Sequence, residues 1–249
     1  LIVRARQCCD FVVASIFVNP TQFGVNEDFS RYPRTPEEDA RGLAGNGCDL
    51  LFLPDVETIY PFGAERAVRV QVPDLGDILE GASRPGHFDG VASVVARLFN
   101  LVQADAAIFG SKDYQQLLVI RRMARDLGFA VEIIAAPIIR EANGLAMSSR
   151  NQYLDAGQHA QAASIHATLR WMTGQLDAGV DSPAEIEAAA MQRLAKAGFD
   201  PDYAVIRCAE DLSRPPQTGK ERAVILIAAR LGGVRLIDNL EWEPVNARP

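Results

Sequence analysis

The chain has 249 residues, of which 48% are hydrophobic and 23% charged, which is enough apolar material for the core of one large domain or two smaller ones. Its 32 acidic residues outnumber 25 Lys and Arg residues, and the net charge of -7 argues against a nucleic-acid partner because it would repel a phosphate backbone. No apolar stretch approaches the roughly 20 residues of a membrane span, and no signal-peptide pattern is present, so we expect a cytoplasmic protein with no membrane partner.

The first elements have clear start and stop signals. Phe11 to Val18 is a run of β-branched and aromatic residues, typical of a strand buried on both faces, and the breaker pair Asn19-Pro20 ends it. Thr35 is followed by a proline and two acids, which predicts a helix as far as about Gly45. Cys48 to Leu53 is the next expected strand.

The middle of the chain alternates strands with helices. Residues 91–102 are rich in strand formers, yet their apolar positions follow helical spacing, so the pattern favours a helix. A strand at Ala106 to Phe109, a helix from Asp113 to about Leu127 and a strand at Ala130 to Ala135 complete a βαβ unit. Residues 1–138 therefore predict a Rossmann-like α/β domain, with a parallel sheet covered on both faces.

The pattern changes in the last third of the chain, where we expect a smaller α+β domain over residues 139–249. Gly232-Gly233 indicates a tight turn between two strands. The expected elements are helices at about 156–178 and 182–197, and strands at Tyr203 to Arg207, Ala223 to Ala229 and Val234 to Ile237.

Gly110-Ser111-Lys112-Asp113 stands where a predicted strand passes into a predicted helix, at the sheet edge where doubly wound folds bind ligands. Backbone N–H groups at a helix start, a glycine that allows close approach and the charge of Lys112 suit a phosphate group. Asp113 and Gln116 would project from the same face of that helix. The alternative is that Ser111 and Asp113 only cap the helix while Lys112 is a solvated surface charge.

Met147-Ser148-Ser149-Arg150 follows a glycine-containing loop. Two hydroxyl groups and a guanidinium group on such a segment can close over a triphosphate and neutralise charge as pyrophosphate departs. Taken alone, so short a string favours the alternative, a polar hinge with a helix-capping serine.

Two further loops carry polar side chains. Asn19 and Gln22 follow the first strand, where neutral amides can hold a substrate carboxylate without blunting it as a nucleophile. Arg84 and His87 place a cation and a titratable group on one tight turn. The alternatives are ordinary turn chemistry for the first loop and a solvated loop for the second.

Taken together, the order and spacing of several strings resemble the pantothenate synthetase family over nearly the whole chain. The strings are Ser15-Ile16-Phe17-Val18-Asn19-Pro20-Thr21-Gln22-Phe23, Arg31-Tyr32-Pro33-Arg34, Arg84-Pro85-Gly86-His87-Phe88, Phe109-Gly110-Ser111-Lys112-Asp113-Tyr114-Gln115-Gln116 and Gly144-Leu145-Ala146-Met147-Ser148-Ser149-Arg150-Asn151.

This resemblance implies a nucleotidyltransferase-like domain and a C-terminal lid domain, assembled as a homodimer, that join pantoate and β-alanine with ATP and Mg²⁺ through a pantoyl adenylate. It implies that ATP is bound by Gly110 to Asp113, Ile139 and Met147 to Arg150. Substrate binding is assigned to Gln22, Gln116, Arg84 and His87, and catalysis to Lys112, Arg150 and Asn19. Asp113 is the candidate metal contact.

The family pattern also includes a glycine-rich loop with two histidines, HxGH, which does not occur in this sequence. Leu1 to Arg6 has the pattern of the last turns of a helix without a start signal, so we expect the natural chain to begin upstream. Two alternatives stay open. One is an inactive substrate-binding or dimerisation fragment; the other is an adenylyltransferase that acts on a phosphorylated cofactor precursor and makes a stable dinucleotide-like product.

Overall fold

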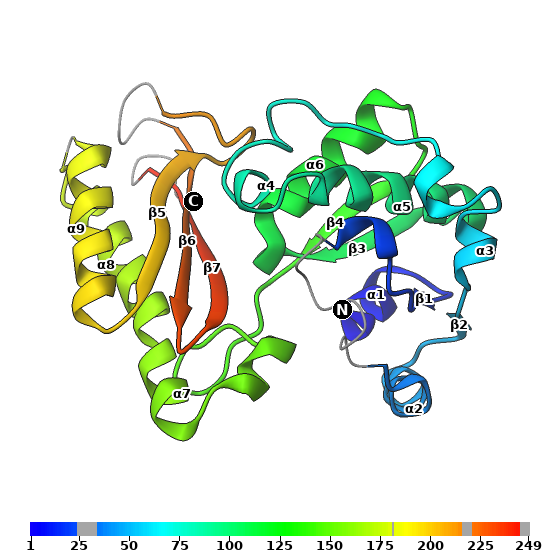
Figure 1. Ribbon diagram of the computed structural model, residues 1–249, viewed down its shortest axis with the longest axis horizontal. Coiled ribbons are helices and arrows are strands. Elements are labelled where there is room, and N and C mark those ends of the chain that lie inside the picture. The colour runs from blue at the N-terminus through cyan, green and yellow to red at the C-terminus, as the bar shows by residue number, and fades with distance from the viewer. Residues whose placement is uncertain (24–33, 181, 216–220, 245–249) are drawn as a thin grey trace. The chain divides into compact units, whose positions relative to one another are not determined.

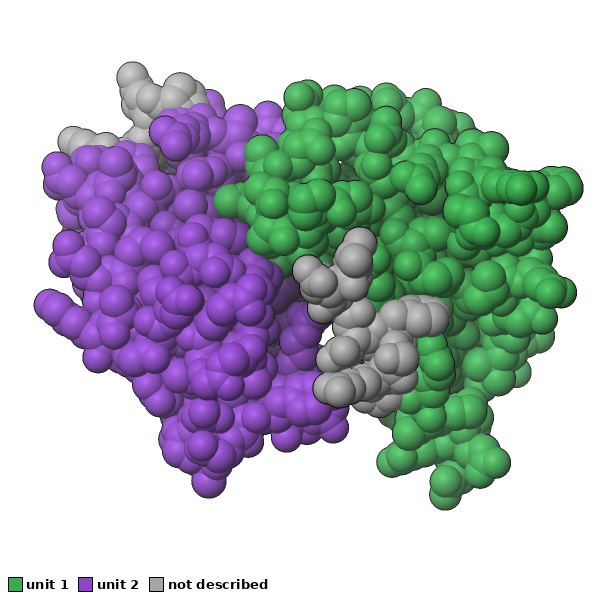
Figure 2. Space-filling view, in the orientation of Figure 1, with its two compact units in different colours: residues 1–111, 115–136 green, residues 112–114, 137–249 purple. Residues whose placement is uncertain are grey.

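The computed structural model describes residues 1–23, 34–180, 182–215 and 221–244, so residues 31–33 of the Arg31 to Arg34 string lie outside the described residues. The chain forms two compact units (Figure 2): unit 1 comprises residues 1–111 and 115–136, and unit 2 comprises residues 112–114 and 137–249. The predicted boundary between residues 138 and 139 stays a prediction. Among the helices of the described residues, none is long and apolar enough to cross a membrane.

Unit 1 combines parallel strand pairs with helices (Figure 1). Its elements in chain order are α1 (Ile2–Cys8), β1 (Val13–Ser15), η1 (Pro20–Gln22), α2 (Pro36–Gly45), β2 (Leu50–Phe52), α3 (Val56–Ile59), η3 (Ala64–Arg66), α4 (Glu80–Ser83), α5 (His87–Val102), β3 (Ala106–Gly110), and, after the η4 turn (Ser111–Asp113), α6 (Tyr114–Asp126) and β4 (Glu132–Ala136).

The strands of unit 1 pair in parallel, β1 with β2 and β3 with β4, as the βαβ pattern predicts. The first strand differs from its prediction, because β1 covers only three residues and is half-buried rather than buried on both faces. Phe11 stays 62% exposed at its start, and Asn19-Pro20 begins the η1 turn after it. Beyond this ladder, Ile16 N donates to Phe52 O at 3.0 Å, and Leu50 N donates to Val12 O at 3.2 Å.

The helix predicted from periodicity at residues 91–102 is confirmed, and it begins earlier, at His87. Residues 90–96 are all buried, so this part of the helix is enclosed on every side, as expected for a helical segment that is largely apolar all round. Phe99 of α5 contacts Phe109 of β3 edge-on, with ring centroids 6.4 Å apart. The helix is therefore fixed against the β3–β4 pair, and its N-terminal end carries His87.

Unit 2 is built on the antiparallel sheet β5–β6–β7, against which α8 and α9 pack (Figure 1). Its elements are η5 (Ser149–Tyr153), α7 (Ala156–Ala162), α8 (Ser164–Asp177), α9 (Pro183–Lys196), β5 (Asp200–Cys208), β6 (Ala223–Leu231) and β7 (Val234–Trp242). Parallel strands followed by an antiparallel α+β unit confirm the predicted fold class.

One turn and one helix of unit 2 bear on the sequence predictions. Gly232 and Gly233, both with positive φ (56° and 85°), form the predicted two-residue turn between β6 and β7. The single helix expected at 156–178 is wrong, because it is interrupted at Ala163, where ψ is -21°, and continues as α8. An alanine-rich sequence gives no local signal for such a break.

Candidate active site

Unit 1 contains an open pocket of about 700 Å³. It is lined by η1, by the turn before α5 and by the first residues of α5. Three of the predicted substrate-binding residues, Gln22, Arg84 and His87, line it together. Asn19 lies beneath η1, only 2% exposed, and contributes through hydrogen bonds rather than through surface.

The amide of Asn19 fixes the orientation of Gln22. Its Oδ1 accepts hydrogen bonds from Thr21 N at 3.2 Å and from Tyr60 Oη at 2.7 Å, so its Nδ2 is the donor. That nitrogen donates to Gly90 O at 3.1 Å and to Gln22 Oε1 at 3.2 Å. The Gln22 amide oxygen is therefore occupied, and within the described part of the chain its Nε2 donates to no other group.

A glycine allows this arrangement. A Cβ at Gly90 of α5 would lie 2.4 Å from Thr21 O, a main-chain atom that cannot move aside cheaply. Because Gly90 has no side chain, η1 lies directly against the first turns of α5. The close approach puts Gly90 O within reach of Asn19.

His87, the first residue of α5, connects the turn before α5 to η1. Its Nδ1 is 2.9 Å from Gln22 O, and its Nε2 is 3.0 Å from Arg84 Nη1. A carbonyl oxygen only accepts and a guanidinium only donates, so the neutral Nδ1–H tautomer satisfies both neighbours. His87 thus fixes the Gln22 main chain and orients Arg84 in the pocket.

Tyr60 is a buried residue at the pocket, and its hydroxyl group holds Asn19. It is 2% exposed, and burial raises the pKa of its phenol, while Asn19, Thr21 and the nearby Arg97 oppose that shift. The Arg97 guanidinium lies 5.0 Å from its ring centroid. Tyr60 therefore stays protonated and donates its proton to Asn19.

Gln116, the other predicted substrate contact, is not among the described residues that line this pocket. It is half-buried on α6. Its neighbour Gln115 is 3% exposed and holds the chain before α4, donating to Leu75 O at 2.7 Å and Ile78 O at 2.8 Å. The family resemblance assigns substrate binding to Gln116 and implies no role for its buried neighbour.

The Gly110 to Asp113 string lies at the end of β3, as predicted, but it divides between the units. Gly110 and Ser111 belong to unit 1, whereas Lys112 and Asp113 belong to unit 2. Lys112 is half-buried and Asp113 is exposed. The main chain here is a 3₁₀ turn, η4, that leads into α6.

In unit 2, Lys112 lines a narrow cleft together with Ser148, Arg150 and Asp238. Ser148 Oγ accepts a hydrogen bond from Arg150 N at 3.2 Å and caps η5, while Ser149 and Arg150 are exposed. The structure thus brings the lysine and the 147–150 string to one cleft although they are far apart in sequence.

The remaining predicted ATP contacts lie on the strand-like segment before η5. Ile139 is 62% exposed and Met147 is 55% exposed, and Met147 N donates to Ile139 O at 2.9 Å. Arg140 and Ala146 form an isolated antiparallel bridge beside them. Two exposed apolar side chains on a paired backbone suit a flat, partly apolar ligand group.

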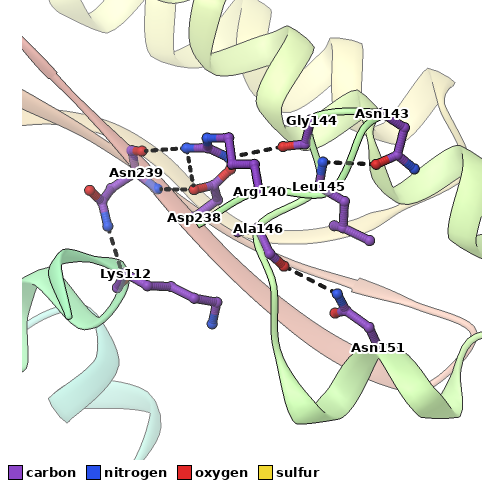
Figure 3. A network of polar contacts seen from close by, with 9 residues as sticks. All are labelled: Lys112, Arg140, Asn143, Gly144, Leu145, Ala146, Asn151, Asp238 and Asn239. Atoms are coloured by element: carbon purple, nitrogen blue, oxygen red, sulfur yellow. Dashed lines mark hydrogen bonds and ion pairs between the residues drawn. The ribbon is translucent and has the colours of Figure 1, made fainter. Parts of the chain in front are cut away.

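Sequence reasoning missed the polar network that supports this cleft (Figure 3). Arg140 and Asp238 form a two-pronged ion pair, with Nη1–Oδ2 at 2.6 Å and Nη2–Oδ1 at 3.0 Å, and the Asp238 side chain is 3% exposed. Asn239 Nδ2 donates to Lys112 O at 2.9 Å. The available signal was the adjacent Asp-Asn pair within β7, because buried polar groups in a strand need partners.

No group of three or more His, Cys, Asp or Glu residues that could hold a metal ion occurs in the residues the structure describes. His159 and His166, which fall within the single helix expected at about 156–178, lie on α7 and α8. His159 Nε2 is 3.1 Å from Glu141 Oε2, and burial, followed by the charge of Arg140, lowers the pKa of His166.

Comparison with known proteins identifies the family. The sequence profile of the family "Pantoate-beta-alanine ligase" matches residues 1–241. The pantothenate synthetase of Xanthomonas euvesicatoria pv. vesicatoria is 58% identical over 242 residues, which cover 97% of this chain and 86% of the relative. That of Xylella fastidiosa strain M12 is 58% identical over 243 residues, again covering 97% and 86%.

Solved structures agree with the sequence comparison. The crystal structure of pantothenate synthetase from Thermus thermophilus has a TM-score of 0.90 and 48% identity, covering 98% of this chain and 88% of that one. Pantoate-β-alanine ligase from Francisella tularensis, complexed with "Beta-gamma ATP" and β-alanine, has a TM-score of 0.78 and 32% identity, covering 96% and 82%. The chain therefore belongs to the pantoate–β-alanine ligase family.

Proposed function

We propose that the protein joins pantoate to β-alanine with ATP, forming pantothenate through a pantoyl adenylate and releasing AMP and pyrophosphate. The observation that carries the substrate assignment is Gln22, which lines the pocket and whose amide oxygen is held by Asn19, so that its Nε2 is left as the donor. A donor at this position suits a carboxylate or hydroxyl oxygen, and pantoate carries both. The Francisella tularensis relative, complexed with "Beta-gamma ATP" and β-alanine, supports the other two substrates.

Pantoate binding is assigned to the unit 1 pocket. Gln22 donates to the substrate, and Arg84, oriented by His87, supplies positive charge without a direct clamp on the reacting carboxylate. Asn19 acts by holding Gln22. Gln116 stays a proposed second amide contact. A carboxylate held by neutral amides keeps more of its nucleophilicity than one paired to a guanidinium.

ATP binding is assigned to residues of both strings. Phosphate contacts come from charged and hydroxyl groups, and the adenine contacts from the exposed apolar pair beside them. The proposed residues are Gly110, Ser111, Lys112, Asp113, Ile139, Met147, Ser148, Ser149 and Arg150.

The proposed chemistry has two steps. A pantoate carboxylate oxygen attacks the α-phosphorus in line, the bond to the bridging oxygen breaks, and pyrophosphate leaves under the charges of Lys112 and Arg150. The β-alanine amine then attacks the acyl carbon, and AMP leaves with the oxygen that came from pantoate. Activation as a mixed anhydride is needed because a free carboxylate has no suitable leaving group for an amine.

Mg²⁺ prefers oxygen ligands and usually keeps several waters while it binds substrate phosphates and one or two carboxylates. A single exposed carboxylate, Asp113, beside the phosphate-binding residues fits this donor set without a dedicated protein cage. Bound with ATP, the ion would supply charge neutralisation at the phosphates.

The adenylate intermediate is tested by following the carboxylate oxygen of pantoate into the products. Pantoate labelled with ¹⁸O in its carboxylate should transfer one labelled oxygen to AMP when the natural full-length protein turns over with ATP and β-alanine. Label in inorganic phosphate with ADP as product would contradict the adenylate, and a stable dinucleotide-like product would favour an adenylyltransferase. Tight pantoate binding without any turnover would instead indicate a binding module.

The role of Lys112 has its own test. Lys112→Ala should lower the single-turnover rate of adenylate formation by about 10²-fold, with a smaller change in ATP affinity, because its charge acts on the departing pyrophosphate. Lys196→Ala, on the exposed last turn of α9, is the matched control and should leave the rate unchanged. An unchanged rate in Lys112→Ala would remove this residue from the chemistry.

We also propose the homodimer that the family resemblance implies. Sedimentation equilibrium at micromolar protein concentration distinguishes a mass of about twice the 27.1 kDa chain from the mass of the monomer.

A further inference from the structure

We infer that Asn239 of β7, supported by the Arg140–Asp238 pair, is a positioning residue that fixes the main chain of Lys112 for adenylate formation. The inference rests on the catalytic role proposed for Lys112. It assigns a function to a pair of strand residues that the sequence motifs do not include.

The contact joins two places that are far apart in the chain. Asn239 Nδ2 donates to Lys112 O at 2.9 Å, and Asn239 is 3% exposed (Figure 3). It lies in the middle of β7, in register with Leu226 of the buried central strand β6, so its backbone cannot shift independently. A hydrogen bond from so rigid a platform fixes the Cα of Lys112, from which a flexible four-carbon side chain extends.

The neighbouring residue, Asp238, makes this platform stiffer. Its Oδ1 accepts from Asn239 N at 2.8 Å and from Arg140 Nη2 at 3.0 Å. Arg140 in turn donates to Asn239 O at 3.3 Å. The Asp238 carboxylate, the Arg140 guanidinium and the main chain of Asn239 thus form a closed set of hydrogen bonds.

The same network holds the second phosphate-binding string. Arg140 Nη1 donates to Gly144 O at 3.0 Å, just before the bridge at Ala146. Asn151, 8% exposed, donates from Nδ2 to Ala146 O at 3.1 Å on the other side of Met147 to Arg150. Each of these hydrogen bonds ends on a main-chain carbonyl of the segment that carries proposed ATP ligands. A residue that positions the segment needs such a bond to its main chain, whereas a residue that only fills space does not.

Independent hydrogen bonds of Tyr114 also hold residues 112–114 to the rest of unit 2. The hydroxyl of Tyr114 is 2.9 Å from both Ala209 O and Glu241 Oε1, and Tyr114 is 4% exposed. Tyr114 fixes the end of the η4 turn, whereas Asn239 acts on Lys112 itself. Loss of Asn239 should therefore loosen the lysine locally without releasing the whole turn.

The test combines Asn239→Ala, Lys112→Ala and the double variant in the natural full-length protein. A displaced catalytic group costs up to about 10²-fold in rate, so Asn239→Ala should lower the single-turnover rate at least about tenfold while KM for ATP changes less than about threefold. If Asn239 acts through Lys112, the double variant should be no slower than Lys112→Ala alone. Asn239→Leu, which keeps the approximate size and loses the donor, repeats the test if the alanine variant folds poorly.

Trp242→Phe is the structural control, because it removes the Trp242 Nε1–Asp177 Oδ1 hydrogen bond of 2.9 Å from the same strand. It should lower Tm and leave the rate within about twofold. A rate of Asn239→Ala equal to wild type, or effects that multiply in the double variant, would overturn the positioning role. An unimpaired Lys112→Ala would instead refute the proposed role of the lysine, and the two failures are thereby distinguished.

Discussion

Asp238→Asn should destabilise unit 2 more than any exposed charge substitution on the same sheet. The Asp238 side chain is 3% exposed and its Arg140 partner 19%, so removal of the charge leaves a nearly buried guanidinium without its counter-ion. Breaking a buried ion pair from one side costs about 3–5 kcal/mol. Because asparagine keeps one oxygen that can accept from Asn239 N, we expect the lower end, about 3 kcal/mol.

Urea unfolding followed by circular dichroism measures this loss, and a Tm decrease of about 6–12 °C should accompany it. Combining Asp238→Asn with Arg140→Gln should give a coupling energy of about 1 kcal/mol or more. Glu243→Gln is the control, because its ion pair with Arg222, at 3.1 Å, is 52% and 41% exposed and should contribute about 0.5 kcal/mol or less. A cost below about 1 kcal/mol for Asp238→Asn, or no coupling to Arg140, would refute the reasoning.

Three other predictions concern the two units separately. Asn19→Asp removes the donor that fixes Gln22 Oε1, so KM for pantoate should rise by about tenfold or more in steady-state kinetics, and an unchanged KM would contradict the assigned amide orientation. Gly90→Ala should push η1 away from α5 and abolish pantoate binding measured by calorimetry, whereas Gly42→Ala, which meets open space on α2, should preserve it; equal binding by both variants would argue against the close approach. Because the pKa of His166 is lowered in the folded state, the unfolded chain binds a proton at this imidazole more readily. The contribution of His166 to the free energy of unfolding is therefore fully present above about pH 6.5 and declines as the pH falls below it. His166→Gln should flatten that part of the unfolding free energy measured from about pH 8 to about pH 5, and an unaltered slope would show that another group is responsible.

The local patterns of the sequence determined most elements correctly. Helical spacing identified α5 despite its valines, and the Gly232-Gly233 pair identified the last hairpin, because both signals act within a few residues. The polar strings likewise identified segments whose residues meet: Gln22, Arg84 and His87 line one pocket. Their roles in substrate binding stay predictions.

Only the tertiary structure decided which polar groups line a pocket and which are buried as supports. Asn19 looks like a substrate contact in the sequence, but burial and the hydrogen bonds of its amide to Thr21, Gln22, Tyr60 and Gly90 make it the support of Gln22. Asp238 and Asn239 gave no motif signal, yet Asn239 meets Lys112, 127 positions earlier in the chain. Sequence spacing fixes periodicity along one element, whereas a buried amide acquires its role from the groups that folding brings around it, and those groups come from distant strands.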